Sequence, residues 1–191
     1  MKREQIGFYF NQSRCIGCYT CTIACKDWHN LELEVNWRIV TTKEQGKFPN
    51  LFVTHLSLSC NHCTNPICAT VCPNNAITKR EEDGIVVVDL KKCLGKDKCG
   101  AVCKNVCPYS SPQFGTEENA RMQKCDLCLD RWVENKKPIC VEACPMRALD
   151  AGPLDQLKTK YGNIKKVDGF FYSTKIDPSI IFNPKTPSKE I

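Results

Sequence analysis

Apolar residues along this chain come in short clusters separated by charged and turn-forming residues. The run from Ile85 to Val88 follows an Asp83-Gly84 pair, which predicts a β-hairpin whose other arm includes Thr78. Near the end, residues 154–161 have a helical pattern, and the clusters at 169–172 and 180–182 predict strands. No cluster approaches the length of a membrane-spanning segment, and residues 1–10 lack the apolar stretch of a signal peptide.

Cysteine is the feature that sets this composition apart, with 16 among 191 residues, whereas aromatic residues make up only 8%. An apolar core alone is therefore not expected to hold the chain together. The cysteines fall into four groups: Cys15, Cys18, Cys21 and Cys25; Cys60, Cys63, Cys68 and Cys72; Cys93, Cys99, Cys103 and Cys107; and Cys125, Cys128, Cys140 and Cys144. Crowding within each group favours a shared metal centre over disulfides, because neighbouring cysteines turn their sulfurs more naturally on one common object.

The spacing within the groups follows one rule. Three residues separate the third and fourth cysteine in every group, while the earlier gaps range from two to eleven. A gap of three places the two cysteines at i and i+4, one turn apart on a short helix. In a two-cluster ferredoxin the fourth cysteine of one run binds the cluster of the other run. The long gap between Cys93 and Cys99 then predicts a lengthened wrapping loop, which costs little entropy if the ligands still converge.

A second repeat supports this pairing. The sequence CPNNAI at residues 72–77 matches CPMRAL at residues 144–149. The chain is therefore expected to continue from the helical turn in the same way after the second and the fourth group. Proline also follows the fourth cysteine at Pro73, Pro108 and Pro145, where its fixed φ redirects the chain.

With CIGCYTC near the start, and KCDLCLDR and KKPICVEACP near the end, the chain resembles the four-cluster electron-transfer subunits of the dimethyl sulfoxide reductase family of molybdenum and tungsten enzymes. The resemblance implies an α+β fold of two interleaved ferredoxin-like halves, each of the bacterial two-cluster type, with a C-terminal extension. Residues 1–58 and 108–152 would form the half with groups one and four, and residues 59–107 the half with groups two and three. Residues 153–191 would pack on a partner subunit.

The resemblance also implies four 4Fe-4S clusters and their ligands, which we name as four cysteine sets. Set one is Cys15, Cys18, Cys21 and Cys144, and set two is Cys125, Cys128, Cys140 and Cys25. Set three is Cys60, Cys63, Cys68 and Cys107, and set four is Cys93, Cys99, Cys103 and Cys72. No 3Fe-4S cluster is expected, because no cysteine of the pattern is replaced.

By the same resemblance, the protein would relay single electrons to or from a large subunit with a molybdenum or tungsten bis-pyranopterin centre. The half with groups one and four would face that subunit, and the other half a membrane quinone-binding subunit or another carrier. No Ser/His/Asp set, phosphate loop or carboxylate pair suggests catalysis by this protein alone. A free-standing polyferredoxin and a zinc-binding structural protein remain alternatives. We expect a cytoplasmic protein, or one exported folded with a partner that carries a twin-arginine signal.

The formal net charge of +6 at first suggests a nucleic-acid or membrane-surface partner. Each oxidised cluster with its four thiolates carries −2, so four clusters bring the holoprotein to about −2. Nucleic-acid binding is therefore not expected. Lys26, Lys104 and Lys124 each neighbour a ligand cysteine and could raise local reduction potentials, although a solvated surface role is favoured.

Four other features have a structural and a functional interpretation. His62, inside CNHC, is expected beside the ligands or at the surface rather than on iron, and His29 has no ligand spacing. Trp28 and Trp37 are expected to pack over the first cluster pair rather than conduct electrons. Residues 131–138 are a docking surface or a solvated insertion.

Overall fold

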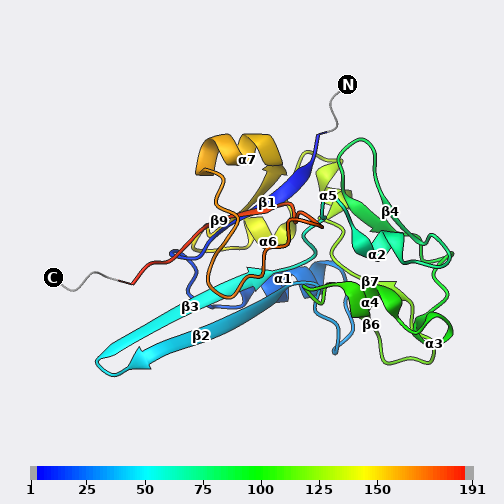
Figure 1. Cartoon of the computed structure of the whole chain (residues 1–191), viewed down its shortest axis with the longest axis horizontal. Helices are drawn as coiled ribbons and strands as arrows, with labels where there is room; N and C mark the ends of the chain where they lie inside the picture. The colour runs from blue at the N-terminus through cyan, green and yellow to red at the C-terminus, as the bar shows by residue number, and fades with distance from the viewer. Residues whose placement is uncertain (1–3, 188–191) are drawn as a thin grey trace.

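The computed structural model describes residues 4–187 and combines short helices with four small sheets (Figure 1). The predicted ranges 1–58 and 153–191 therefore extend beyond the described residues at both ends. The strands are β1 (Ile6–Asn11), β2 (Ile39–Lys47), β3 (Asn50–Leu58), β4 (Ile77–Lys79), β5 (Val86–Val88), β6 (Gln113–Phe114), β7 (Met122–Gln123), β8 (Leu149–Pro153) and β9 (Ile180–Asn183). The helices are α1 (Thr20–Trp28), α2 (Ile67–Thr70), α3 (Lys96–Cys99), α4 (Val102–Val106), α5 (Leu129–Trp132), α6 (Ile139–Glu142) and α7 (Leu154–Tyr161). This mixture agrees with the predicted α+β class. Within residues 4–187, no helix has both the length and the apolar character needed to cross a bilayer.

The largest sheet has the strand order β8-β1-β9. Its central strand β1 pairs antiparallel with β8 and parallel with β9. Because side chains alternate between the two faces of a strand, Phe8 and Phe10 enter the main core, whereas Tyr9 faces α7 and contacts Leu154 and Leu157. The apolar run of β1 is thus explained by burial on both faces of the sheet.

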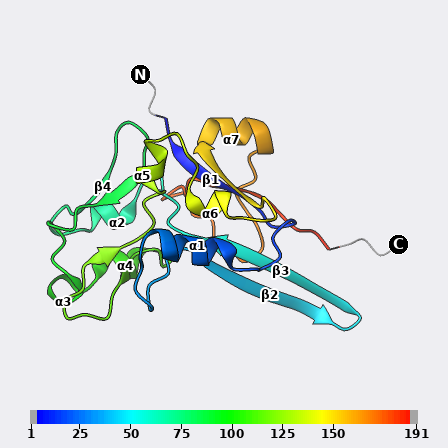
Figure 2. The ribbon, with the colours of Figure 1, turned by 180° about the vertical axis from the view of Figure 1, so that it is seen from behind.

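The longest strands form the β2–β3 hairpin, which extends away from the rest of the molecule (Figures 1 and 2). Its register runs from Ile39 opposite Leu58 to Lys47 opposite Asn50. Val40 and Leu56 are buried at its base, while Phe48 at its tip is 94% exposed. This hairpin was not predicted from the sequence.

The cysteine groups in the middle of the chain are accompanied by two much smaller sheets, β4–β5 and β6–β7. The hairpin predicted around Asp83-Gly84 is confirmed, with Ile77 opposite Val88. Gly84 has φ +70°, and the Asp83 carboxylate accepts a hydrogen bond from the Ile85 N–H at 2.9 Å. The core of this region is small and consists of Ile77, Val86, Cys103 and Met122.

The predicted helical turns at the third and fourth cysteines are confirmed. Cys21 and Cys25 both lie on α1, while α2, α4 and α6 contain Cys68, Cys103 and Cys140 and end just before Cys72, Cys107 and Cys144. In space α1 packs against α6, and α2 packs against α4. The helices therefore pair the first group with the fourth and the second with the third.

Several residues of the C-terminal segment lie in the protein's own core, and packing of this segment on a partner subunit stays a prediction. The predicted helix is α7 and the predicted strand at 180–182 is β9, which covers the β1 edge that would otherwise be unpaired. The strand predicted at 169–172 is wrong. Phe170 stacks instead on Tyr109, with ring centroids 5.2 Å apart, and packs against Phe182.

Residues 173–179, which we call the strap, lie between the loop that follows α7 and strand β9, and they contact the second cysteine group. The Thr64 N–H donates to the Asp177 carbonyl at 2.8 Å, and the Ser179 N–H donates to the Asn61 carbonyl at 3.0 Å. The Asp177 carboxylate accepts hydrogen bonds from Lys165, Tyr172 and Thr64. The strap therefore fixes the loop that contains Cys60 and Cys63.

Candidate iron-sulfur sites

Three cavities are each lined by four cysteines, three from one group and the fourth from another. They contain set one (Cys15, Cys18, Cys21 and Cys144), set three (Cys60, Cys63, Cys68 and Cys107) and set four (Cys72, Cys93, Cys99 and Cys103). Each fourth cysteine reaches its cavity from the far end of a helical turn, as the interleaved pattern requires.

The remaining four cysteines make up set two, and all of them are buried. Burial raises the pKa of the Cys25 thiol, and the neighbouring Cys125 and Cys140 raise it further. Burial also raises the pKa of Cys128, again with a contribution from Cys125 and Cys140. Cys25 from α1 thus lies near Cys125 and Cys140 of the fourth group.

The distances between sulfurs distinguish a cluster from a single zinc ion. A tetrahedral Zn²⁺ with Zn–S bonds of about 2.3 Å holds its sulfurs roughly 3.8 Å apart. Among the described residues, which include all sixteen cysteines, no three Sγ atoms lie within 4.8 Å of one another. The cysteine sets therefore lack the close sulfur packing of a mononuclear zinc site, which is compatible with the larger 4Fe-4S core.

The repeat noted in the sequence has an equivalent local structure at both positions. The Ala76 N–H donates to Cys72 Sγ at 3.3 Å, and the Ala148 N–H donates to Cys144 Sγ at the same distance. The residue before each alanine, Asn75 or Arg147, has a positive φ of 49° or 50°. This left-handed turn aims a backbone donor at the thiolate, where it stabilises negative charge.

Comparison with known proteins adds an independent observation. Residues 51–154 match the family model of the 4Fe-4S dicluster domain. The B subunit of the anaerobic dimethyl sulfoxide reductase of Escherichia coli (strain K12) is 44% identical over 193 residues, which cover 97% of this protein and 91% of the relative. The formate dehydrogenase iron-sulfur subunit of Wolinella succinogenes is 34% identical, with 81% of this protein and 84% of the relative covered. The thiosulfate reductase electron transfer subunit PhsB of Salmonella typhi is 37% identical, with 76% and 74% covered.

This chain belongs to the iron-sulfur electron-transfer subunits of the dimethyl sulfoxide reductase family. As a member of that family it carries 4Fe-4S clusters, and its 16 cysteines fit four of them. Its role is electron transfer for an oxidoreductase.

The thiols of this family member must lose protons when clusters bind. Burial raises the pKa of Cys68 and Cys125 to about 12 and that of Cys103 to about 11. Because the thiolate is the ligand, cluster assembly displaces these protons. The exposed Cys18 differs, since the Thr20 hydroxyl donates to its sulfur at 3.4 Å and lowers its pKa.

The four sets also differ in their depth. Set two is buried throughout, whereas set one includes Cys18, the one exposed cysteine of the sixteen. Sets three and four each have one buried cysteine and three of intermediate exposure. Set two is therefore the most deeply buried of the four sets.

His62 and Lys124 lie deeper than the sequence suggested. His62 is fully buried, and its Nδ1 accepts a hydrogen bond from the Val86 N–H at 3.0 Å, so the surface alternative for this residue is wrong. Lys124, for which a solvated position was favoured, is only 3% exposed. Its ammonium donates to the carbonyls of Val86 and Cys125 and faces the cavity of set three.

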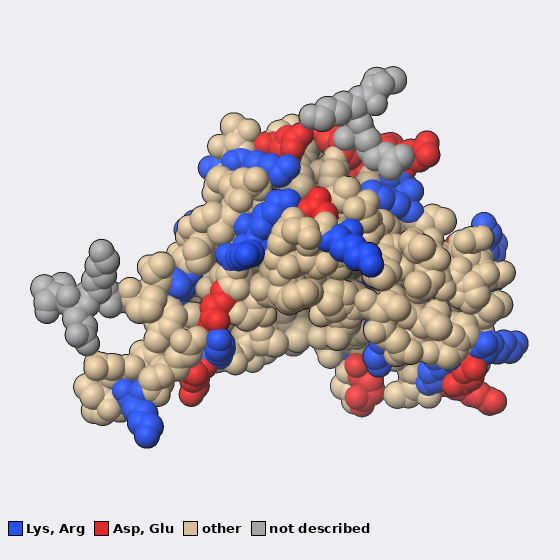
Figure 3. Space-filling model, viewed as in Figure 1, with Lys and Arg blue, Asp and Glu red and all other residues tan. Residues whose placement is uncertain are grey.

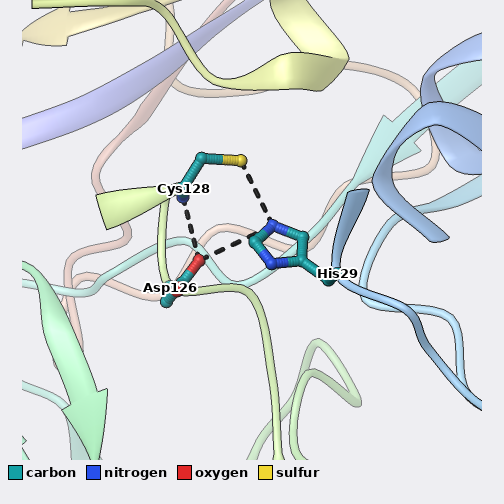
Figure 4. A group of neighbouring side chains, drawn as sticks. All are labelled: His29, Asp126 and Cys128. Atoms are coloured by element: carbon teal, nitrogen blue, oxygen red, sulfur yellow. Dashed lines mark hydrogen bonds and ion pairs between the residues drawn. The ribbon is translucent and has the colours of Figure 1, made fainter. Parts of the chain in front are cut away.

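The spacing of residues in the sequence did not reveal the contact of His29 with Cys128 and Asp126 (Figure 4). Its Nε2 lies 3.3 Å from Cys128 Sγ and 3.8 Å from an Asp126 carboxylate oxygen. These three atoms are close enough to hold a metal ion, but Cys128 belongs to set two, so we assign His29 as a hydrogen-bonding partner of that thiolate. The two residues come from distant parts of the chain, which local spacing cannot reveal.

The indole N–H groups of Trp28 and Trp37 near set two are both hydrogen bonded. Trp37 packs against the His29 ring with centroids 4.5 Å apart, and Trp28 donates its indole N–H to Asp130 at 2.8 Å. Arg131, at the start of the insertion 131–138, is buried against Trp28, while residues 133–137 are exposed.

Charged side chains of both signs are interspersed on the face shown in Figure 3. Lys26 donates to three backbone carbonyls, those of Glu32, Leu33 and Val35, and Lys104 is exposed. The surface charge visible on this face does not form one basic patch.

Proposed function

We propose that this protein is the electron-transfer subunit of an anaerobic dimethyl sulfoxide reductase, and that a large bis-pyranopterin subunit is its partner. The observation that carries the proposal is the near full-length similarity to the B subunit of dimethyl sulfoxide reductase, together with cavities lined by complete cysteine sets. When bound, each 4Fe-4S cluster takes up and returns one electron. The protein itself supplies ligands, spacing and exclusion of water.

Within this proposal, each cysteine set holds one cluster, and the protein forms two interleaved ferredoxin-like halves. Sets one and two belong to the half made from residues 1–58 and 108–152, and sets three and four to the half around residues 59–107. The helix pairs α1–α6 and α2–α4 support this division, because each pair contributes cysteines to two neighbouring sets.

The order of the sets along the path is one, two, three, four. Sets one and two are joined by α1, which contains Cys21 of one set and Cys25 of the other. Sets two and three are neighbours, since Cys60 and Cys125 lie in the same buried cluster and Cys60 contributes to the raised pKa of Cys125. Sets three and four are joined by the turn from Cys103 to Cys107.

We assign the docking face for the large subunit to the surface around set one. Ile16, Tyr19 and Met146 line its cavity, and they are 58%, 48% and 37% exposed. At the other end, Leu94 lines the cavity of set four and is 39% exposed. That end is the proposed contact for a membrane quinone-binding subunit or another carrier.

Iron and acid-labile sulfide analysis of anaerobically purified protein tests the cluster count. We expect about sixteen of each per chain, because each 4Fe-4S cluster contains four. Zinc in a colourless protein would support the structural zinc protein instead, and about twelve iron atoms would contradict four complete clusters.

Anaerobic pull-down from the native source tests the partner. A large subunit at fixed stoichiometry, with dimethyl sulfoxide reduction by the complex, is the expected result. Recovery of the protein alone at its monomer mass, with its iron content intact, would favour a free-standing polyferredoxin.

A further inference from the structure

Arg38 is the largest fully buried side chain of the described residues, with 1% exposure. It lies just before β2, at the base of the long hairpin, where its guanidinium packs over the Phe8 ring at 4.7 Å. Its Nη1 donates to Ser57 Oγ at 3.2 Å, and its Nη2 donates to Ser59 Oγ at 2.9 Å. The Nε atom has no hydrogen-bond partner. The side chain is thus held firmly, but by neutral groups.

No Asp or Glu among residues 4–187 lies within ion-pair distance of Arg38. A buried guanidinium stays charged and is costly without a counter-charge. The other buried arginine, Arg131, has such a partner in Glu142. Arg38 therefore needs a source of negative charge other than a carboxylate.

Cysteines of two different sets supply that charge once cluster binding has made them thiolates. Burial alone would lower the pKa of Arg38, but the Cys140, Cys21, Cys125 and Cys25 thiolates raise it above its ordinary value. Cys21 belongs to set one and the other three to set two. The Arg38 guanidinium lowers the pKa of Cys140, against the larger effect of burial, and Ser57 links Arg38 to Cys21, whose sulfur lies 3.4 Å from the Ser57 hydroxyl.

Resting on the cysteine sets proposed above, we infer that Arg38 is a shared counter-cation for sets one and two that raises the reduction potentials of both of their clusters together. The step it affects is the arrival of one electron from a donor, with no proton transferred. The electron makes a cluster and its four thiolates more negative, and a fixed buried cation stabilises that state in a medium of low dielectric constant. Arg38 reaches Cys21 through Ser57 and is not itself a ligand, so it acts as a positioning and tuning residue.

The second half lacks an equivalent cation between its two sets. The buried Lys and Arg of the described residues are Arg38, Lys124 and Arg131, and only Lys124 lines the cavity of set three or set four. Lys124 lowers the pKa of Cys68 in set three, behind the larger effect of burial, but it does not line the cavity of set four. The structure therefore predicts a coupled pair of more easily reduced clusters next to the large subunit.

Potentiometric EPR titration of the purified holoprotein complex tests this inference. Arg38→Gln and Arg38→Met both remove the positive charge, with side chains that pack differently, whereas Arg38→Lys keeps the charge. Lys43→Gln is the control, because it removes an exposed cation from the same hairpin. For the neutral variants, we expect the ratio of reduced to oxidised cluster at fixed potential to fall about tenfold or more in sets one and two, which is about 59 mV for a one-electron couple. Sets three and four should be unchanged, Arg38→Lys should retain most of the effect, and Lys43→Gln should have none.

Unchanged midpoints in a fully loaded neutral variant, or equal shifts in all four clusters, would overturn the inference about Arg38. If both neutral variants lose iron, the iron content decides. Loss of about eight iron atoms that Arg38→Lys restores supports charge balance for two sets, whereas loss that lysine fails to restore shows a purely structural role. A wild-type complex without four clusters would instead contradict the proposed function.

Discussion

The two halves proposed for this molecule share one predicted ligation pattern, but different frameworks surround their cysteine sets. Sets one and two lie beside the three-stranded sheet, whose core contains Phe8, Phe10 and Phe182. Sets three and four are accompanied by two-stranded hairpins and a core of four buried residues, one of which is Cys103. The gap of three fixes the geometry of ligation, while the surrounding core sets burial and charge.

This difference has a consequence for electron transfer. The first half combines the fully buried set two with a buried arginine, whereas most cysteines of the second half are partly exposed. Burial and nearby charge are two of the protein's means of setting a cluster potential. The comparison therefore predicts that the halves differ in potential and in their dependence on iron.

Removal of iron by anaerobic chelation should distinguish the two regions. The small core around sets three and four should open first, because it has few apolar residues apart from its cysteines. Hydrogen exchange of the Val86–Val88 amides should accelerate about tenfold or more relative to those of Phe8–Phe10, equivalent to ~1.4 kcal/mol of local opening free energy. Equal acceleration in the two regions would remove the distinction between the halves.

Phe182→Ala tests how much the C-terminal strand β9 stabilises the protein. Phe182 is fully buried in the central sheet, so truncation should lower the free energy of unfolding by about 3–5 kcal/mol. Phe171→Ala is the matched control, because Phe171 is 67% exposed and its loss should change stability by less than about 0.5 kcal/mol. Anaerobic denaturant unfolding measures both. Similarly small losses of stability in both variants would indicate that β9 contributes little to the stability of this protein alone and would favour its packing on a partner subunit.

Asp177→Asn should have a smaller effect on the strap. It weakens partly buried hydrogen bonds from Lys165, Tyr172 and Thr64, which we expect to cost about 1 kcal/mol. The cluster of set three should also become more sensitive to oxygen, since Ile176 of the strap lines that cavity. Glu134→Gln breaks an exposed ion pair with Lys136 and should have almost no effect. If both variants lose the set three signal at the wild-type rate in air, the strap does not protect that site.

Local signals in the sequence were sufficient for much of the site. The i, i+4 spacing predicted the helical turns, and the Asp83-Gly84 pair before a valine run predicted the β4–β5 hairpin. The features that sequence reasoning missed depend on contacts between distant residues. Pairing of β9 with β1 and burial of Arg38 between two cysteine sets are examples, because neither residue pattern is unusual on its own. The β2–β3 hairpin was missed since most of its outer residues are exposed and have no apolar alternation.

The most direct test of interleaved ligation compares two cysteines one helical turn apart. Cys103 lies on α4 and Cys107 follows it, yet they line the cavities of sets four and three. EPR of Cys107→Ser should match that of Cys60→Ser, with the set three cluster damaged and the set four cluster intact. Cys103→Ser should match Cys93→Ser instead. Damage to one and the same cluster in Cys103→Ser and Cys107→Ser would contradict the interleaved arrangement and the relay built on it.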